Sequence, residues 1–358
     1  MQLQKWYAVH QRPLPWRVNP KFKGQPYAVW ISEVMSQQST LKMMMPYFDK
    51  WMKTFPTIKS LAFADEDLVL KLWAGLGYYS RARNLKKAAL ELHKKSQTHS
   101  FPKSAKEWQQ LPGIGQYTSK AIAAICFDEK VLGLDGNVIR VLSRFYGVED
   151  PLNNRNHRQR LEEIVALWEK SLPDNSSGKV LQSLMDLGAM ICRPRNAAIC
   201  GSCPLKENCI SFERGQVAQI PQTKKRRQIE RILVFAPMFS SPKTKNLSVL
   251  LRKIPENERL AGQWSLPLWE FPNDADGQMM KQRISEKFEL LHKVKHVITH
   301  HNYEMYGIRA GVWDSIKVPQ GHRFFAVDEI FRAGRQYEKF TVSRATQKIL
   351  NFLVDSSS

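Results

Sequence analysis

The apolar residues of this chain change their periodicity once, near residue 209, and this change constrains the fold more than any other feature. From residue 27 to residue 209 they recur at helical spacing, with repeated breaks at proline or glycine. Beyond residue 209 we predict strands at 232–238, 247–252, 295–299 and 305–312, and helices at 279–291 and 343–353. The pattern therefore predicts an all-α domain followed by a domain of mixed α and β structure.

The two predicted domains are separated by a polar and basic segment. It contains Pro221, followed closely by Lys224, Lys225, Arg226 and Arg227, and is typical of a linker. A chain of 358 residues is long enough for two domains with separate cores. We predict a helical domain at 1–215, a linker at 216–231, an α/β domain at 232–354 and a frayed tail at 355–358.

The charge balance favours a polyanionic partner. The chain has 54 Lys and Arg residues against 33 Asp and Glu residues, which gives a formal charge of +21. Counterion release makes phosphate contacts favourable for such a protein, so nucleic acid is the first candidate. The sequence shows no signal peptide, lipid signal or apolar run of membrane-spanning length. We therefore expect a cytoplasmic, nucleoid-associated protein without a membrane partner.

Four of the five cysteines lie within eighteen residues, at Cys192, Cys200, Cys203 and Cys209. The intervals between them contain seven, two and five residues. In a reducing compartment this crowding favours metal ligation over disulfides, and thiolates without a nearby His suit zinc or an iron–sulfur cluster. The residues alone do not choose between the two metals, and the role is expected to be structural. Cys126 is predicted to be a buried structural thiol.

A glycine hairpin at 111–118 predicts a phosphate-binding turn. Gly113 and Gly115 flank Ile114, and a helix is expected to follow them. Two glycines so close together indicate a turn too tight for side chains, and the backbone N–H groups of the next helix could hold a phosphate without reading sequence. An ordinary turn between two helices is the alternative.

Two carboxylates stand out in this helical region. Glu33 is surrounded in sequence by an apolar stripe that includes Trp30 and Val34, so a desolvated acid with a raised pKa is the hypothesis and solvent exposure the alternative. Asp135 precedes the next apolar stripe. It is interpreted either as a helix N-cap or as a carboxylate beside the phosphate site, where the anomeric carbon of a sugar would be held.

Polar and aromatic residues in two segments of the helical region suit a protein that opens a duplex. Gln37 and Gln38 follow the Glu33 helix and could contact base edges or fill the space left by an extruded base. Tyr78 lies close to Arg81 in a segment that combines aromatic rings with cations. An apolar stripe through Leu68, Leu72, Trp73 and Leu76 is assigned to the core.

Taken together, these residues resemble the helix-hairpin-helix DNA glycosylase superfamily and, within it, the adenine DNA glycosylases of the MutY type. The resemblance is collinear along the chain. It is carried by 14–17, 32–38, 75–79, the hairpin at 111–118, 134–138, 185–189 and the four cysteines.

The resemblance implies a DNA N-glycosylase of base excision repair. Its expected reaction is hydrolysis of the N-glycosidic bond of adenine mispaired with 8-oxoguanine or guanine. Glu33 is then expected to protonate the flipped adenine, while Asp135 stabilises or captures the cationic sugar before water attacks. Tyr117 and Asn137 would orient the water and Asp135.

The resemblance also assigns binding positions. Arg17 and Gln182 match residues near the adenine, and the hairpin glycines Gly113 and Gly115 match DNA contacts. The positions expected to intrude at the orphaned partner base are Gln38, Leu76 and Tyr78. The expected partner is double-stranded DNA with a mispair, bound by a monomer.

Position 117 distinguishes the possible activities. Bifunctional relatives place a lysine there, whose amine attacks the sugar and cleaves the strand. Tyr117 predicts a monofunctional enzyme that leaves an abasic site. A lyase for oxidised pyrimidines and a non-catalytic sensor of DNA damage are the rival hypotheses.

The resemblance implies a [4Fe-4S] cluster on the four cysteines, although the usual first interval of the family is six residues rather than seven. It also implies a Nudix-like C-terminal domain, indicated by 262–267 and 269–272, that reads 8-oxoguanine. The glutamate-rich helix of a working pyrophosphohydrolase is not matched at 279–283, so nucleotide hydrolysis is not expected. The lesion-sensing loop of the family corresponds to Ile298, Thr299 and His300, with Thr299 and His300 as the expected lesion-reading residues.

Overall fold

The structure is a computed structural model that describes residues 2–95, 101–152, 154–222, 230–240, 248–255, 258, 262–298, 301–312, 320–327, 330 and 342–355. The chain divides into two compact units, one formed by residues 1–64 and 83–225 and the other by residues 65–82 and 226–358. The domain bounds expected from the sequence stay a prediction. No described helix has the length and apolar character needed to cross a membrane.

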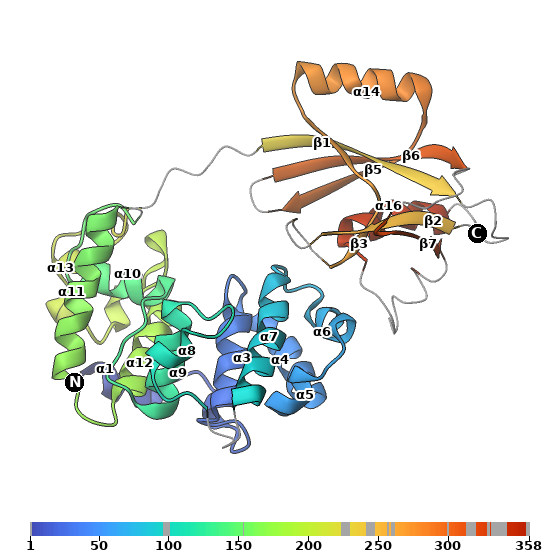
Figure 1. The fold of residues 1–358 in the computed structure, drawn as a ribbon. Coiled ribbons are helices and arrows are strands. Elements are labelled where there is room, and N and C mark those ends of the chain that lie inside the picture. Colours follow the sequence, from blue (N-terminus) through green and yellow to red (C-terminus); the bar gives the residue numbers. More distant parts are fainter. Residues whose placement is uncertain are drawn as a thin grey trace. The chain divides into compact units, whose positions relative to one another are not determined.

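The first unit is helical throughout its described residues (Figure 1). Its α-helices are α1 (Gln2–His10), α2 (Pro15–Val18), α3 (Pro26–Ser36), α4 (Leu41–Thr54), α5 (Ile58–Ala62), α7 (Ser80–Lys95), α8 (Ala105–Trp108), α9 (Gln116–Phe127), α10 (Gly136–Phe145), α11 (Arg155–Ser171), α12 (Ser177–Met190) and α13 (Ile210–Glu213). Three 3₁₀ turns lie in the cysteine segment, namely η1 (Arg195–Ala197), η2 (Cys200–Ser202) and η3 (Lys206–Asn208).

Helix α3 lies at the centre of this unit. A proline at its first turn fixes the backbone for helix entry, and every residue from 27 to 35 is buried. The helix packs against both α4 and α9. Trp30 on α3 and Trp108 on α8 are fully buried, with ring centroids 5.9 Å apart. The predicted apolar stripe around Glu33 is therefore confirmed as core.

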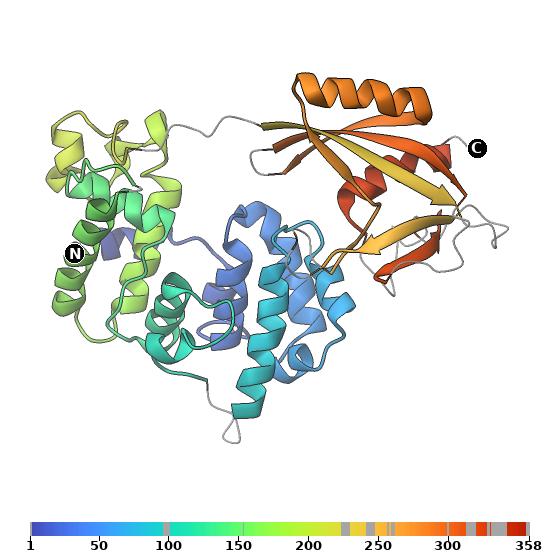
Figure 2. The same cartoon turned by 45° about the horizontal axis from the view of Figure 1, so that its top comes forward.

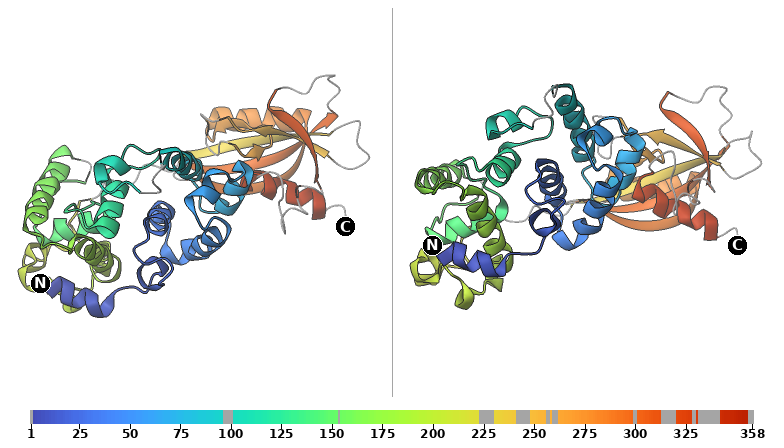
Figure 3. Two further views of the ribbon diagram at one scale, coloured as in Figure 1. Left: turned by 60° about the horizontal axis from the view of Figure 1, so that its bottom comes forward. Right: turned by 90° about the horizontal axis from the view of Figure 1, so that it is seen from below.

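A second group of helices packs around α12. It contacts α1, α9 and α10, and Figure 3 shows α1 lying beside α12. Apolar side chains of these helices form one core, with Leu3, Ala124, Val138 and Leu184 among its members. Because α3 packs on α9 and α9 packs on α12, residues far apart in sequence meet at α9.

The second unit contains α6 (Glu66–Trp73) and an α/β region. The elements of this region are β1 (Glu230–Ser240), β2 (Ser248–Lys253), β3 (Trp264–Ser265), β4 (Trp269–Pro272), α14 (Ala275–Lys287), β5 (Glu289–Ile298), β6 (His301–Val312), β7 (His322–Ala326) and α16 (Arg344–Asp355). The described strands form a four-stranded sheet in the order β4-β1-β6-β5 and a three-stranded sheet in the order β3-β2-β7. Strands β1 and β6 are parallel, and the other pairs are antiparallel.

Alternation along β1 explains how helices cover both faces of the four-stranded sheet. Leu233 and Phe235 pack with Ile284 of α14, whereas Val234 and Ala236 pack with the core that contains α16. Figures 1 and 2 show α14 and α16 on opposite faces of this sheet. The predicted fold class, an all-α domain followed by an α/β domain, is confirmed.

Two details differ from the sequence prediction. The helix expected at 279–291 is α14, which ends at Lys287, because Phe288 is extended and the chain then pairs with β6 as β5. Leu68 belongs to the stripe predicted as core but is 38% exposed, whereas Leu72 and Trp73 of the same stripe are buried.

Candidate active site

Glu33 is a carboxylate in the apolar interior of the helical unit. It lies on α3 and is only 4% exposed. Its pKa is raised to about 7, chiefly because burial disfavours the charged form; a hydrogen bond from Tyr117 opposes the rise, and the charge of Asp135 adds to it. The predicted desolvation of Glu33 is confirmed. A carboxyl group with this pKa can hold and release a proton near neutral pH.

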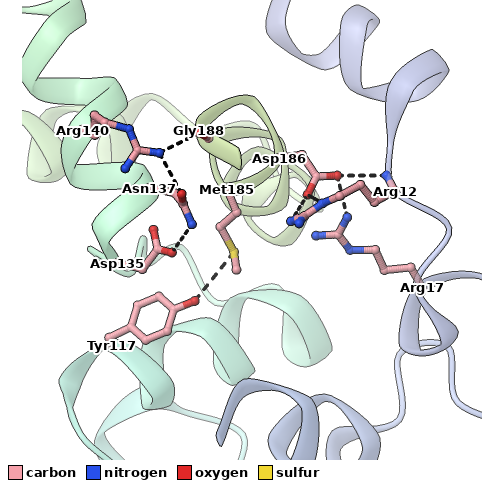
Figure 4. A network of polar contacts seen from close by, with 9 residues as sticks. All are labelled: Arg12, Arg17, Tyr117, Asp135, Asn137, Arg140, Met185, Asp186 and Gly188. Carbon is pink, nitrogen blue, oxygen red and sulfur yellow. Dashed lines mark hydrogen bonds and ion pairs between the residues drawn. The ribbon is translucent and has the colours of Figure 1, made fainter. Parts of the chain in front are cut away.

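Tyr117 is placed against Glu33 by the first turn of α9. Its hydroxyl donates a hydrogen bond of 2.8 Å to Glu33 Oε2. The same hydroxyl lies 3.8 Å from Met185 Sδ (Figure 4). Burial raises the pKa of Tyr117 well above its usual value, and the nearby charge of Glu33 raises it further. A Cβ at Gly133 would lie 2.8 Å from the Tyr117 ring, so the glycine leaves room for it. The phenol therefore stays protonated and donates to Glu33 rather than to Asp135.

Asp135 is the N-cap of α10. Its Oδ1 accepts a hydrogen bond of 2.7 Å from the backbone N–H of Val138. Its Oδ2 accepts one of 3.0 Å from Asn137 Nδ2. The N-cap interpretation is confirmed, and the same side chain lies close enough to Glu33 to raise its pKa. The structure thus brings Glu33, Tyr117, Asp135 and Asn137 together.

Arg140 connects this site with the cysteine segment, a link that the sequence reasoning missed. Arg140 Nη2 donates to Asn137 Oδ1 at 2.9 Å and to the Gly188 carbonyl at 2.7 Å (Figure 4). Arg140 Nε donates to the Cys192 carbonyl at 2.7 Å. A Cβ at Gly188 would lie 2.6 Å from Asn137 Cβ, so only glycine permits this approach. The amide of Asn137 is therefore fixed from both sides.

Arg17 belongs to a second polar cluster in the same unit. Both Arg17 and Arg12 donate to the carboxylate of Asp186, which is fully buried on α12 (Figure 4). In the sequence, Asp186 contributes only to the resemblance, and Arg12 is not among the predicted site residues. A single acid within an apolar helical stretch was the available signal, because such a residue needs a partner when buried.

The predicted adenine-binding residues line one cavity. Arg17, Gln182, Tyr7 and Cys126 all contribute to a cavity of about 1000 Å³. Gln182 Nε2 donates to the Gly178 carbonyl at 3.1 Å. Arg17 Nε is buried and has no hydrogen-bond partner among the described residues. Cys126 is half-buried as a whole residue, while burial raises the pKa of its thiol, so its predicted burial is met in part.

The two hairpin glycines differ in their roles. Gly113 has φ of +75°, and a Cβ there would lie 2.5 Å from Asn84 Cβ, so this position requires glycine. Gly115 is the N-cap of α9 with ordinary φ of −84°, and a Cβ there would have no neighbour within 4 Å. The expectation of a turn too tight for any side chain is therefore correct at Gly113 and wrong at Gly115, where the backbone faces open space.

The three residues expected to intrude into DNA are placed differently. Gln38 and Tyr78 have φ of 55° and 48°, in the left-handed region that such residues rarely adopt. Tyr78 is 48% exposed, whereas Leu76 is 4% exposed and lies in the protein interior. Tyr78 is thus presented at the surface, while Leu76 is not.

The four clustered cysteines lie close to one another and to Arg144. Arg144 Nη1 donates to Cys192 Sγ at 3.3 Å, and Cys209 Sγ donates to the Arg144 carbonyl at 3.5 Å. The pKa of Cys203 is raised to about 11, chiefly by burial, with further contributions from the other three cysteines. Within the described ranges, no three His, Cys, Asp or Glu residues already stand in a metal-binding arrangement. The chemistry of the donor set, four neighbouring half-buried thiols, fits a thiolate-bound centre.

The expected lesion-reading residues Thr299 and His300 lie outside the described residues. Their neighbour Ile298 ends β5 and pairs with His301 at the start of β6.

The sequence of residues 31–168 matches the family described as HhH-GPD superfamily base excision DNA repair protein. The chain is 35% identical over 310 residues to the adenine DNA glycosylase of Buchnera aphidicola subsp. Acyrthosiphon pisum, a match that covers 83% of each protein. It is 37% identical over 234 residues to the adenine DNA glycosylase of Mus musculus, covering 64% of this chain and 44% of the mouse protein. A solved structure titled as a thermostable thymine-DNA glycosylase has a TM-score of 0.51 and 22% identity, covers 60% of this chain and 94% of its own, and supports the helical fold alone.

These matches define a base excision repair protein of the HhH-GPD superfamily. Within it, the chain belongs to the adenine DNA glycosylases. A match that covers 83% of the chain has to reach into the C-terminal α/β region, so the membership does not rest on the helical domain alone.

Proposed function

We propose that this protein removes adenine opposite 8-oxoguanine or guanine in double-stranded DNA by hydrolysing its N-glycosidic bond. The observation that carries the proposal is the pair formed by the buried acid Glu33, with a pKa of about 7, and the neighbouring carboxylate Asp135. One group can supply a proton while the other remains available to stabilise positive charge. Membership of the adenine DNA glycosylases supports adenine as the base.

The reaction starts with protonated Glu33. Its proton passes to a ring nitrogen of the flipped adenine, so the electrons of the C1′–N9 bond leave with a neutral base. The sugar becomes an oxocarbenium ion, which Asp135 stabilises or captures. Water then adds its hydroxyl to C1′ and gives its proton to a carboxylate, which leaves an abasic site. Asn137, held by Arg140, keeps the Asp135 carboxylate in one orientation.

The proposed enzyme is monofunctional. Schiff-base chemistry at the sugar requires a neutral amine as nucleophile. Tyr117 instead presents a phenol that donates to Glu33, and burial raises its pKa well above the usual value. The side chain at this position therefore supports a hydrolytic reaction without strand cleavage, which argues against the lyase hypothesis.

DNA is the macromolecular partner, and the proposed contacts follow from the geometry. Gly115 and Gln116 are exposed, and a Cβ at Gly115 would meet no neighbour within 4 Å, so a phosphate can approach the backbone N–H groups there. Arg17 Nε is a buried donor without a hydrogen-bond partner among the described residues. Arg17 and Gln182 line the same cavity, and these two observations support a base-binding role for both residues. We propose that Gln38 and Tyr78 contact the opened duplex, and that the protein acts as a monomer.

We also propose that Cys192, Cys200, Cys203 and Cys209 hold a [4Fe-4S] cluster. When bound, the cluster serves as a structural group that joins the two ends of the cysteine segment. Arg144 already donates to Cys192 and to the Arg193 carbonyl, so the chain supplies cationic donors around the thiols. The Nudix-like C-terminal domain is proposed to read 8-oxoguanine through Thr299 and His300.

The discriminating experiment uses a duplex with adenine opposite 8-oxoguanine. After incubation with the protein, strand breaks are measured with and without hot alkali. Breaks that need alkali are the expected result for a monofunctional glycosylase. Breaks without alkali would favour the lyase, and no breaks under either condition, with retained binding, would favour the non-catalytic sensor.

A further inference from the structure

We propose that Asp186 is a positioning residue for base excision, which holds the guanidinium groups of Arg12 and Arg17 in place beside the catalytic acid Glu33. The inference rests on the proposed function, because it assigns a role within the same site. It concerns a residue that acts through its two arginine partners.

The geometry around Asp186 leaves little freedom to either arginine. Asp186 Oδ1 accepts from Arg12 Nε at 2.7 Å and lies 2.5 Å from Arg12 Nη2. Asp186 Oδ2 accepts from the Arg12 backbone N–H at 3.0 Å and from Arg17 Nη1 at 2.7 Å. The Asp186 side chain is 0% exposed and that of Arg17 is 5% exposed. Both oxygens of the carboxylate are therefore used, and two segments of the chain are fixed by one residue.

Arg17 depends on this anchor because its own helix is short. Helix α2 has four residues and its N-cap Leu14 makes no capping hydrogen bond through its side chain. One helical turn does not hold a long side chain rigidly without tertiary contacts. Arg17 also contacts the ring of Tyr7, whose centroid lies 5.7 Å from Arg17 Cζ.

The cluster is electrically coupled to Glu33. The charged and titratable groups that act on Glu33 come from several segments, and they are Tyr117 of α9, Asp135 at the start of α10, Arg17 of α2 and Arg12 before it. Cys126 of α9 is also coupled to Glu33. Both arginines lower the pKa of Glu33, opposing the larger effect of burial. Together Arg12, Arg17 and Asp186 carry a net charge of +1, which favours the carboxylate that remains when Glu33 gives up its proton.

A purely structural anchor would have different consequences. If Asp186 only joined α12 to the segment at 12–17, its loss would lower stability without changing how excision depends on pH. If it positions charge beside Glu33, its neutralisation leaves two guanidinium groups without a counter-charge. Their positive charges then act on Glu33 without the opposing charge of Asp186, and the pKa of Glu33 falls.

The test is the single-turnover rate of adenine excision by the full-length protein, measured across pH for the wild type and for Asp186→Asn. We expect a rate loss of roughly 10- to 100-fold, as for misplaced catalytic groups, with little change in duplex affinity. Because excision requires protonated Glu33, the basic limb of the profile should move to lower pH. A limb that stays in place or moves to higher pH would overturn the proposal.

Glu169→Gln is the matched control. Glu169 also accepts from two segments of the helical unit, Lys120 Nζ at 3.1 Å and the Leu132 N–H at 2.8 Å. Glu169→Gln weakens a contact between two segments, although this side chain is 20% exposed, and it leaves the arginine cluster intact, so the pH profile should not move. If the basic limb of Glu169→Gln moves as far as that of Asp186→Asn, loosening the helical unit is enough to shift the pH profile. This result would overturn the role assigned to Asp186.

Arg17→Met provides a second variant in case Asp186→Asn does not fold. It removes a positive charge near Glu33 and leaves Asp186 paired with Arg12. The basic limb should therefore move to higher pH, opposite to the shift expected for Asp186→Asn. A shift in the same direction for both variants would contradict the inference. If the wild type itself excises no adenine, the proposed function fails. If the wild type excises adenine but the pH profiles of the variants do not shift, only this inference is refuted.

Discussion

Among the described residues, the helical unit buries several charged side chains, whereas the C-terminal α/β region buries none of its Asp, Glu, Lys or Arg residues. In the helical unit, Glu33, Arg17 and Asp186 are buried and paired. In the α/β region, the ion pair of Arg309 with Glu289 is formed by side chains that are 66% and 60% exposed. Taking a charge out of water is costly, and an exposed ion pair contributes little. The buried charges of the helical unit are therefore explained by chemistry rather than by stability.

The largest expected effect is on activity, through Glu33→Gln. The variant keeps the shape of the side chain but has no acidic proton, so excision should fall by roughly 10²- to 10⁴-fold. Single-turnover kinetics with the mispaired duplex measure this loss, and an affinity measurement should show retained binding. Substantial residual turnover would remove Glu33 from the acid role.

Asp135→Asn separates the two roles of Asp135. Asparagine is also a good N-cap, so the unfolding temperature should change little. The negative charge that would stabilise the cationic sugar is lost, and excision should fall by roughly 10²- to 10³-fold, as when one stabilising group is removed from an active site. Excision within a few-fold of the wild type would leave Asp135 with a capping role alone.

Glu33 should also lower the stability of the folded protein. Because its folded-state pKa is raised to about 7 from an ordinary value of 4.5, the folded state binds more protons than the unfolded state between these values. Stability is therefore lost as pH rises through this window. Compared with the wild type, Glu33→Gln should gain roughly 3 kcal/mol of unfolding free energy at pH 8, and the gain should vanish below pH 4.5. Denaturant unfolding at both pH values checks this, and equal stability at pH 8 would contradict it.

The smallest effect is expected in the α/β region. Glu289 on β5 lies opposite Arg309 on β6, and Arg309 Nε is 3.2 Å from Glu289 Oε2. Because both side chains are exposed, Glu289→Gln should change the unfolding free energy by less than about 1 kcal/mol and leave excision unchanged. A larger change, measured by denaturant unfolding, would show that the two regions do not differ in the way described.

Much of this architecture is predictable from local sequence signals. Helical spacing around Trp30 predicted a buried helix, and the isolated acid Glu33 within it predicted a raised pKa. The position of Asp135 before an apolar stripe predicted the N-cap. These properties depend on neighbours in sequence, which is why they could be predicted without the structure.

The remaining parts of the site depend on tertiary contacts. Asp186 is separated from Arg12 by 174 residues, and Arg140 reaches a carbonyl 52 residues away. No periodicity or spacing specifies such pairs. The end of α14 at Lys287 was also missed, because pairing of β5 with β6 overrides the helical pattern at 288–291. The roles of the individual site residues stay predictions.

The central claim is that Glu33 acts as a buried acid poised near neutral pH. The most direct test is the pH dependence of the single-turnover rate of adenine excision from a duplex with adenine opposite 8-oxoguanine. The account predicts a rate that falls tenfold per pH unit above a midpoint near 7, with this limb absent from the residual activity of Glu33→Gln. A wild-type rate that stays constant from pH 6 to pH 9 would contradict it.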